Sequence, residues 1–369
     1  MSYFIFSCDG HITEPKDLFE DVLPTSLKDK AMRVEVRGEH RYLLSGDQVL
    51  NRSRIVQNAD LGRSHLLGTR EIAGRKLDMA QDGIDAELIF PQQGMWAFGI
   101  ADPDVELAHA QAYNDWASDF FRNDRDIFVA AAILPVRNLE QTLQEMKRAA
   151  ALGFKVQMLP STTPPGVAPY NSDKWDPVFS LATELDVVFT LHTGTGIEGG
   201  TTIERGPGGA IINYSHQIVD AQRSAMYLVA GGVLDRFPKS RIAFIECGAS
   251  WLGALSERMD EVHEAHSAYV RPVLSRKPSE IIRDQVKASF QRDRECIMGR
   301  SVTGHRAIMW AADYPHMEGT FPRSQEIINE LFAGIDITED EKADILGRTA
   351  ADFFGLYQHR EQAKAAALN

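Results

Sequence analysis

The stretch that decides the fold runs through residues 128–159 and reads as strand, helix and strand. It opens with FVAAAILP at residues 128–135, and residues 139–152 then carry apolar side chains at helical spacing. Gly153 follows at the position where a left-handed helix cap is expected, and residues 154–159 are mostly apolar again. Continuous apolar strands around an amphipathic helix are typical of parallel strands that are buried on both faces. The stretch therefore predicts a βαβ unit.

The same alternation extends along the chain in both directions. Eight apolar segments are expected to form strands: a segment that begins at Ile5, then 86–91, 128–135, 154–159, 187–192, 242–246, 286–290 and 307–313. Helical patterns separate most of them, and no Gly-x-Gly-x-x-Gly turn follows the first. We therefore expect an α/β fold, a closed (β/α)8 TIM-type barrel, rather than an open doubly wound sheet.

Two additions to the barrel are expected. Residues 32–36 and 42–44 flank Gly38, which predicts a small β-hairpin after the first strand, and the polar residues 51–75 read as a loop that could cover a site. We treat residues 30–75 as an insertion within one domain that spans residues 1–369. Extra C-terminal helices are expected around residues 340–346 and 350–362.

Composition narrows the class of partner. The chain has 369 residues and a formal net charge of −13, which argues against nucleic acid and anionic membranes as partners. Its three cysteines are widely spaced and odd in number, which is not the pattern of a disulfide framework. The N-terminus has no signal-peptide pattern, and no apolar run is long enough to span a bilayer. We expect a cytoplasmic protein that acts on a small molecule.

Acids and histidines stand at the ends of several expected strands, namely Asp9, His11, His192, Glu246 and Asp313. In this type of barrel the carboxyl ends of the strands form the active-site face. Imidazoles and carboxylates together suit a divalent transition metal, with zinc the first expectation and manganese or iron as alternatives. Each residue alone is also typical of a turn, a cap or a buried strand end, so the prediction rests on their joint occurrence.

The sequence resembles a known family. Four blocks carry the resemblance, and they are Asp9-Gly-His11-Ile-Thr-Glu14-Pro15, Leu191-His192, the segment from Phe244 to Leu252, and Trp310-Ala-Ala-Asp313-Tyr-Pro-His316-Met-Glu318-Gly319. They are similar to the amidohydrolase 2 branch of the amidohydrolase superfamily, which includes the aminocarboxymuconate-semialdehyde decarboxylase-like enzymes. The resemblance spans almost the whole chain and is weakest in residues 32–75.

The resemblance implies one divalent metal ion held by Asp9, His11, His192 and Asp313. It also implies that Asp313 handles a proton as general base or acid, while the metal activates water for attack on a carbonyl carbon. Superfamily members with two metals use a lysine on the fourth strand. Lys155 lies near the beginning of that strand and not at its end, so one metal is expected.

Two residues depart from the family pattern. Asp9 stands where many relatives have histidine, and a carboxylate there remains a competent ligand. Glu246 stands where many decarboxylase relatives have histidine, and an anion at that position would repel a substrate carboxylate. Glu246 could be a ligand, a proton carrier or a partner that orients a ligand, and a salt bridge to an arginine is an equally good structural interpretation.

Four further residues are candidate substrate contacts: His316, His216, His263 and Trp251. His316 follows the eighth strand, where side chains face the mouth of the pocket. His216 and His263 belong to helical segments, where solvated or packed histidines are common, and Trp251 could equally be a core residue.

These observations support three functional hypotheses. The first is a metal-dependent hydrolase of amides, esters, thioesters or activated ketones, with Asp313 and Glu246 as catalytic residues. The alternative keeps the fold and the metal but has the protein decarboxylate an aromatic or unsaturated carboxylic acid, and the third is a non-catalytic metal-binding scaffold. A homo-oligomer, most simply a dimer, is expected from the resemblance. The identity of the substrate does not follow from the sequence.

Overall fold

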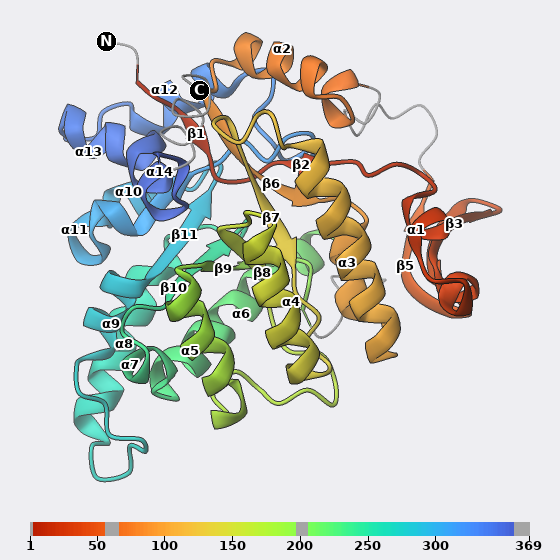
Figure 1. The fold of residues 1–369 in the computed structure, drawn as a ribbon. Helices are drawn as coiled ribbons and strands as arrows, with labels where there is room; N and C mark the ends of the chain where they lie inside the picture. The colour runs from red at the N-terminus through yellow and green to blue at the C-terminus, as the bar shows by residue number, and fades with distance from the viewer. Residues whose placement is uncertain (1–2, 56–65, 197–205, 358–369) are drawn as a thin grey trace, which may run out of the picture.

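A computed structural model describes residues 3–55, 66–196 and 206–357. Its main sheet consists of nine parallel strands that curl around a common axis (Figure 1). They are β1 (Phe6–Ser7), β2 (His11–Ile12), β6 (Ala86–Pro91), β7 (Phe128–Ile133), β8 (Val156–Pro160), β9 (Val188–His192), β10 (Arg241–Ile245), β11 (Val286–Phe290) and β12 (Ile308–Trp310). Two of them, β1 and β2, are the two halves of the expected first strand. The expected (β/α)8 barrel is confirmed.

The strands follow one another around the barrel in chain order, from β1 through β6 to β12. The ring closes between the first and last strands by backbone hydrogen bonds, from Cys8 N to Trp310 O at 3.1 Å, from Asp313 N to Asp9 O at 3.0 Å and from His11 N to Tyr314 O at 2.7 Å. Because all strands run in the same direction, their carboxyl ends share one rim of the barrel.

Most helices cover the outer side of the sheet, whereas α1 (Leu18–Val22) lies apart from it (Figure 1). The other helices are α2 (Ile72–Asp82), α3 (Pro103–Phe120), α4 (Leu139–Ala151), α5 (Asp176–Leu185), α6 (Gly209–Ala230), α7 (Val233–Arg236), α8 (Trp251–Ala265), α9 (Pro278–Gln285), α10 (Arg294–Met298), α11 (Arg300–Thr303), α12 (Ser324–Phe332), α13 (Glu339–Ala343) and α14 (Thr349–Phe353). Short helical turns are η1 (Thr25–Lys30), η2 (Leu67–Thr69), η3 (Gly94–Gly99), η4 (Asp173–Trp175), η5 (His305–Ala307) and η6 (Asp344–Arg348).

Local sequence explains where the longer helices begin. Asp102 accepts hydrogen bonds from the N–H groups of Asp104 and Val105 at the start of α3, and Pro103 takes the first helical position. Asn138 caps α4 in the same way through Glu140 and Gln141. The long helix α6 begins at Gly209, directly after Gly208, whose backbone is left-handed at φ 78°.

The insertion forms a three-stranded antiparallel sheet of β3 (Met32–Arg37), β4 (His40–Ser45) and β5 (Gln48–Arg54). The hairpin was expected, but its third strand was not, because residues 51–54 fall within the expected polar loop. The end of that loop also differs, since residues 72–75 belong to α2. Residues 56–65 of the loop lie outside the described part of the chain. The extent of the insertion as a unit stays a prediction.

Two further observations concern the chain as a whole. The three cysteines, Cys8, Cys247 and Cys296, are free and buried. Among the described residues, no helix combines the length and apolar character needed to cross a membrane.

A buried histidine attaches the small sheet to the barrel. His109, on α3, donates through Nδ1 to Val105 O at 2.7 Å and accepts at Nε2 from Met32 N at 2.9 Å. Its ring also lies 5.0 Å from that of Phe19. Burial lowers the pKa of His109 to about 4, so the imidazole is neutral at pH 7 and can accept the bond from β3.

Acid is expected to loosen this attachment. A histidine whose folded-state pKa is depressed contributes stability that is present above its ordinary pKa and is lost as pH falls toward the folded value. Between pH 6.5 and 4 the loss is on the order of 3 kcal/mol for His109. Denaturant unfolding of the wild type and His109→Gln should show a stability gap at pH 7 that closes at low pH. The exposed His266, at the end of α8, replaced in the same way, serves as control, and a gap that does not change with pH would contradict the prediction.

Candidate metal centre

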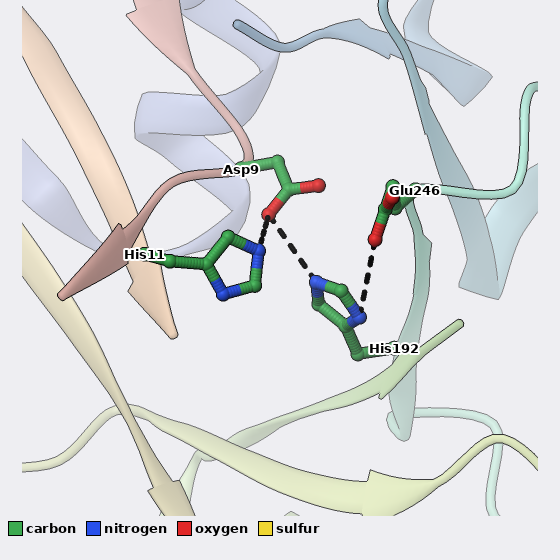
Figure 2. A group of neighbouring side chains, drawn as sticks. All are labelled: Asp9, His11, His192 and Glu246. Atoms are coloured by element: carbon green, nitrogen blue, oxygen red, sulfur yellow. Dashed lines mark hydrogen bonds and ion pairs between the residues drawn. The ribbon is translucent and has the colours of Figure 1, made fainter. Parts of the chain in front are cut away.

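Four side chains from widely separated strands meet at the carboxyl rim of the barrel (Figure 2). Asp9 follows β1, His11 begins β2, His192 ends β9 and Glu246 follows β10. Asp9 Oδ1 lies 3.4 Å from His11 Nε2 and 3.3 Å from His192 Nε2. Separations of this size are those of donor atoms around one small divalent ion, whose bonds to nitrogen and oxygen are about 2.0–2.2 Å long.

Several donor atoms of this cluster are buried without a hydrogen-bond partner among the described residues. They are Asp9 Oδ2, His11 Nε2 and Asp313 Oδ2. Burying a carboxylate or an imidazole nitrogen without a partner is costly, so such atoms indicate a missing ligand. His11 Nδ1 contacts Pro91 O at 3.2 Å and His192 Nδ1 contacts Thr193 O at 2.8 Å. These contacts hold the δ protons and leave both Nε2 atoms available to a metal. The donor set fits a divalent cation.

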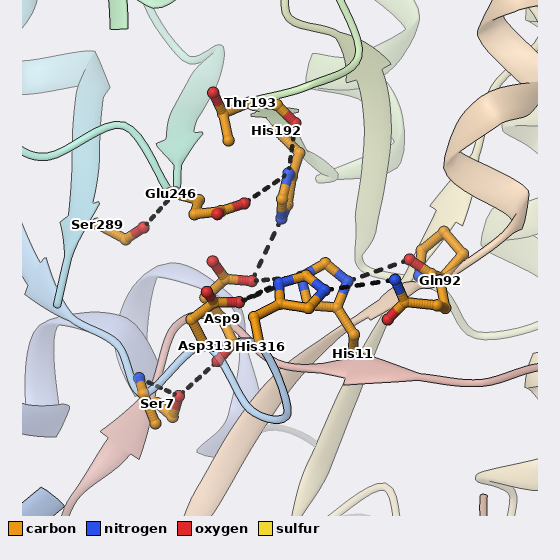
Figure 3. A network of polar contacts seen from close by, with 12 residues as sticks. Ser7, Asp9, His11, Gln92, His192, Thr193, Glu246, Ser289, Asp313 and His316 are labelled. Carbon is orange, nitrogen blue, oxygen red and sulfur yellow. Dashed lines mark hydrogen bonds and ion pairs between the residues drawn. The ribbon is translucent and has the colours of Figure 1, made fainter. Parts of the chain in front are cut away.

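Asp313 follows β12 and completes the cluster together with His316 (Figure 3). Asp313 Oδ1 lies 3.5 Å from His11 Nε2 and 2.9 Å from His316 Nδ1. Burial alone would raise the pKa of Asp313, but His316 and His11 reverse this and lower it below its ordinary value. Burial opposes the charge on His316, yet Asp313 raises the pKa of His316 to about 9. The pair is therefore a carboxylate beside an imidazolium.

The backbone is strained at two of these positions. Asp313 has φ 51° and Glu246 has φ 56°, and both are among the three described residues other than glycine with positive φ. Side chains with a Cβ rarely adopt this region, and its use concentrates at functional sites. Glu246 comes directly after β10 and Asp313 comes three residues after the end of β12, and both side chains belong to the rim cluster.

Among the described residues, Glu246 pairs with a histidine, and no ion pair with an arginine is found. Its Oε2 lies 3.7 Å from His192 Nδ1, and its backbone N–H donates to Ser289 Oγ at 2.9 Å. Burial, followed by the charges of Asp313 and Asp9, raises the pKa of Glu246 well above its ordinary value. The sequence argument treated Glu246 as an anion that repels a carboxylate, and this surrounding weakens that argument.

The structure places the candidate substrate contacts differently from one another. His316 lies in the cluster, with its ring 4.2 Å from that of His11. Trp251 begins α8 at the same rim, but its ring packs against Phe244 and its Nε1 donates to Gly248 O. His263 lies in the last turn of α8, about 18 Å further along that helix, and His216 is exposed on α6. Two groups of ligand-type side chains lie close together among the described residues: Asp9, His11, His192 and Glu246, and His11, Glu246, Asp313 and His316. Neither His216 nor His263 belongs to them.

Sequence reasoning missed Gln92, whose Nε2 lies 3.3 Å from His316 Nε2 (Figure 3). It comes directly after β6, so its place at a strand end was an available signal. It also missed Ser7, whose hydroxyl donates to Asp9 O at 2.7 Å and accepts from Ala312 N at 2.9 Å. No local pattern marks that serine, because its partners come from both ends of the chain.

A family comparison agrees with this geometry. The model of the amidohydrolase family, described as "Amidohydrolase", matches residues 10–356. The chain belongs to the amidohydrolase family. The predicted resemblance is confirmed, and the chain is an enzyme of that family. The scaffold hypothesis therefore loses its support.

Solved structures of other proteins show the same fold. An amidohydrolase from Mycobacterium avium subsp. paratuberculosis superposes with a TM-score of 0.77 at 19% identity, covering 96% of this chain and 100% of that one. The 5-carboxyvanillate decarboxylase of Sphingomonas paucimobilis has a TM-score of 0.69 at 17% identity, with 96% and 99% covered. A dihydroxybenzoic acid decarboxylase from Polaromonas, solved with manganese and the inhibitor 2-nitroresorcinol, has 0.65 at 17%, with 96% and 98% covered.

Proposed function

We propose that this amidohydrolase is a metal-dependent, non-oxidative decarboxylase of an aromatic or unsaturated carboxylic acid. The observation that carries the proposal is the buried rim cluster, in which Asp9, His11 and Asp313 have donor atoms without a partner among the described residues and His192 Nε2 lies 3.3 Å from Asp9 Oδ1. The named decarboxylases among the structural neighbours support this reaction over hydrolysis, which was the first expectation from the sequence.

In this proposal Asp9, His11, His192 and Asp313 hold one divalent ion. Manganese comes first, since decarboxylase structures of this fold contain it, and zinc remains an alternative that the donor set also suits. The ion supplies Lewis acidity that stabilises negative charge on substrate oxygens. Two neutral imidazoles and two carboxylates leave the site with little net charge once a divalent ion is bound.

Asp313 and His316 supply the proton chemistry. When the bond between carbon and the carboxylate breaks, its electron pair remains on the substrate carbon and must be protonated. Asp313 Oδ1 lies 2.9 Å from His316 Nδ1, and the two groups share one exchangeable proton. The other ring nitrogen of His316, Nε2, faces Gln92. We assign the proton to this pair: the His316 imidazolium holds it, and Asp313 receives it from His316 and passes it to the substrate carbon.

Hydrolysis remains the second candidate because of Glu246. A carboxyl group 3.7 Å from His192 is suited to orient a water molecule beside the cluster, and water attack would then follow on an ester, amide or thioester carbonyl. His316 and Trp251 are retained as proposed substrate contacts in either reaction, whereas the positions of His216 and His263 give them no support.

Carbon dioxide release separates the two reactions. Protein loaded with manganese or with zinc should release carbon dioxide from at least one member of a panel of hydroxybenzoates and methoxylated or unsaturated carboxylic acids. The matched panel contains the corresponding methyl esters, amides and thioesters, and hydrolysis is followed by acid production. Rapid cleavage of the esters or amides without carbon dioxide from any free acid would replace our proposal by the second candidate.

A further inference from the structure

Arg75 lies directly behind the candidate metal centre and is almost completely buried. It belongs to α2, on the outer side of the barrel, and its side chain is 1% exposed. Arg75 Nε donates to Glu87 Oε2, on β6, at 2.6 Å. Burying a guanidinium is unfavourable unless its donors are satisfied; here Nε and Nη1 are hydrogen-bonded, whereas Nη2 has no hydrogen-bond partner among the described residues.

The guanidinium also contacts the two backbone segments that carry candidate ligands. Nη1 donates to His11 O at 2.9 Å and to Gly68 O at 3.4 Å. The guanidinium carbon stacks 4.0 Å from the ring centre of Tyr314, the residue after Asp313. The Tyr314 hydroxyl in turn donates to Asp78 Oδ2 at 2.5 Å, one turn further along α2. One helix therefore holds both segments.

These two segments are also the seam at which the barrel closes. His11 N bonds to Tyr314 O, and Asp313 N bonds to Asp9 O, so a shift of one segment moves the other. Three of the four candidate ligands, Asp9, His11 and Asp313, belong to this seam. The contacts that α2 makes with this seam therefore influence the distances between the donor atoms of all three residues.

The surrounding backbone is shaped for the arginine. A Cβ on Gly10, between Asp9 and His11, would lie 2.5 Å from Arg75 Nη2, which is too close for the guanidinium to keep its place. A Cβ on Gly68 would overlap Asp78 and come 2.7 Å from the Tyr314 hydroxyl. Glycine at these positions lets the guanidinium and the tyrosine approach the seam closely.

We propose that Arg75 is a positioning residue that fixes the seam between residues 9–11 and 313–314, and thereby sets the geometry and affinity of the metal centre. This inference rests on the proposed metal site but goes beyond it, since Arg75 contacts no candidate ligand atom. Glu87 balances the charge of Arg75. We therefore attribute the positioning of the seam to the planar shape of the guanidinium and to its several hydrogen bonds. Lysine retains the charge but lacks the fork of donors and the flat face.

The test measures metal binding without turnover. Wild type, Arg75→Lys and Arg75→Met are titrated with Mn(II), and free ion is followed by its electron paramagnetic resonance signal. Both variants are expected to bind about 10- to 100-fold more weakly, as residues that orient ligands do. Protein loaded with Co(II) is expected to show a changed visible absorption spectrum in both variants, which reports altered coordination and not a loss of folded protein.

Arg125 provides the matched control. It is also partly buried and donates to Leu152 O and Ser118 Oγ, both at 2.9 Å, near the amino ends of the strands. Arg125→Met should lower stability while leaving Mn(II) affinity and the Co(II) spectrum as in the wild type. If Arg75→Met is too unstable to purify, Asp78→Asn, which weakens the bond to Tyr314, should lower the affinity in the same direction.

Three results would overturn the inference, and each is distinct. Arg75→Lys with wild-type affinity and spectrum would show that the fork geometry is unimportant. Equal weakening in Arg125→Met would show that general destabilisation explains the loss. A wild type that binds neither Mn(II), Zn(II) nor Co(II) would remove the proposed metal site itself, and with it any role for Arg75 in positioning its ligands.

Discussion

Replacement of Asp313 by asparagine is expected to lower turnover by about 1,000-fold or more while the protein keeps most of its metal. The amide preserves the shape of the side chain and one oxygen donor, but it neither accepts nor delivers a proton. It also removes the charge that raises the pKa of His316, which now stands at about 9. The ion pair between Asp313 Oδ1 and His316 Nδ1 is lost at the same time.

Turnover is measured on the best substrate of the carboxylic acid panel, and metal content by elemental analysis. Asp352→Asn is the matched control, because Asp352 is an exposed aspartate that pairs with Arg306 far from the rim cluster. That variant should keep wild-type turnover. Undiminished turnover in Asp313→Asn would remove Asp313 from the proton transfer, whereas loss of turnover together with all of the metal would assign it the role of ligand alone.

Replacement of His192 by alanine is expected to abolish both metal binding and the stability that the metal supplies. A ligand present at about 1,000 times its dissociation constant stabilises the folded state by about 4 kcal/mol. The wild type should therefore gain about 5 °C in melting temperature when saturated with Mn(II). His192 ends β9 and contributes Nε2 to the cluster, so the variant should gain almost nothing.

The control for His192→Ala is His266→Ala, which replaces an exposed histidine at the end of α8 and should respond to Mn(II) as the wild type does. Chelation of the metal from the wild type should reproduce the melting temperature of metal-free protein and stop turnover, and added Mn(II) should restore both. A His192→Ala protein that is stabilised by Mn(II) to the same extent as the wild type would exclude His192 as a ligand.

Most of the side chains at the rim could be predicted from the sequence, because the direction of each strand follows from local sequence and fixes the end of the barrel at which its last residues lie. A run such as residues 188–192 predicts a buried parallel strand, and parallel strands in a barrel bring their carboxyl ends to one rim. His192 and Asp9 are 183 residues apart, yet this rule predicts that they meet. The family motifs around Asp313 added the same conclusion independently.

The partners of those residues were a different matter. The sequence left Glu246 open between a ligand, a proton carrier, a partner that orients a ligand and a salt bridge to an arginine, and the structure places it beside His192. Gln92 was overlooked because polar residues at strand ends are common, and only its approach to His316, 224 positions away, distinguishes it. Likewise, the third strand of the insertion, β5, is defined by its pairing with β4. No pattern in the sequence indicated that β4 would pair on both of its edges.

The barrel, the order of its strands and the ligand-type side chains at one rim could be predicted from the sequence. This is because apolar periodicity and chain direction are properties of residues that are neighbours in the chain. Only the tertiary structure decided how that rim is held. Arg75 reaches His11 across 64 positions and Tyr314 across the closure of the barrel. The pairing of a buried charge with a particular backbone carbonyl depends on packing in three dimensions, so it cannot be predicted from the local pattern of the sequence.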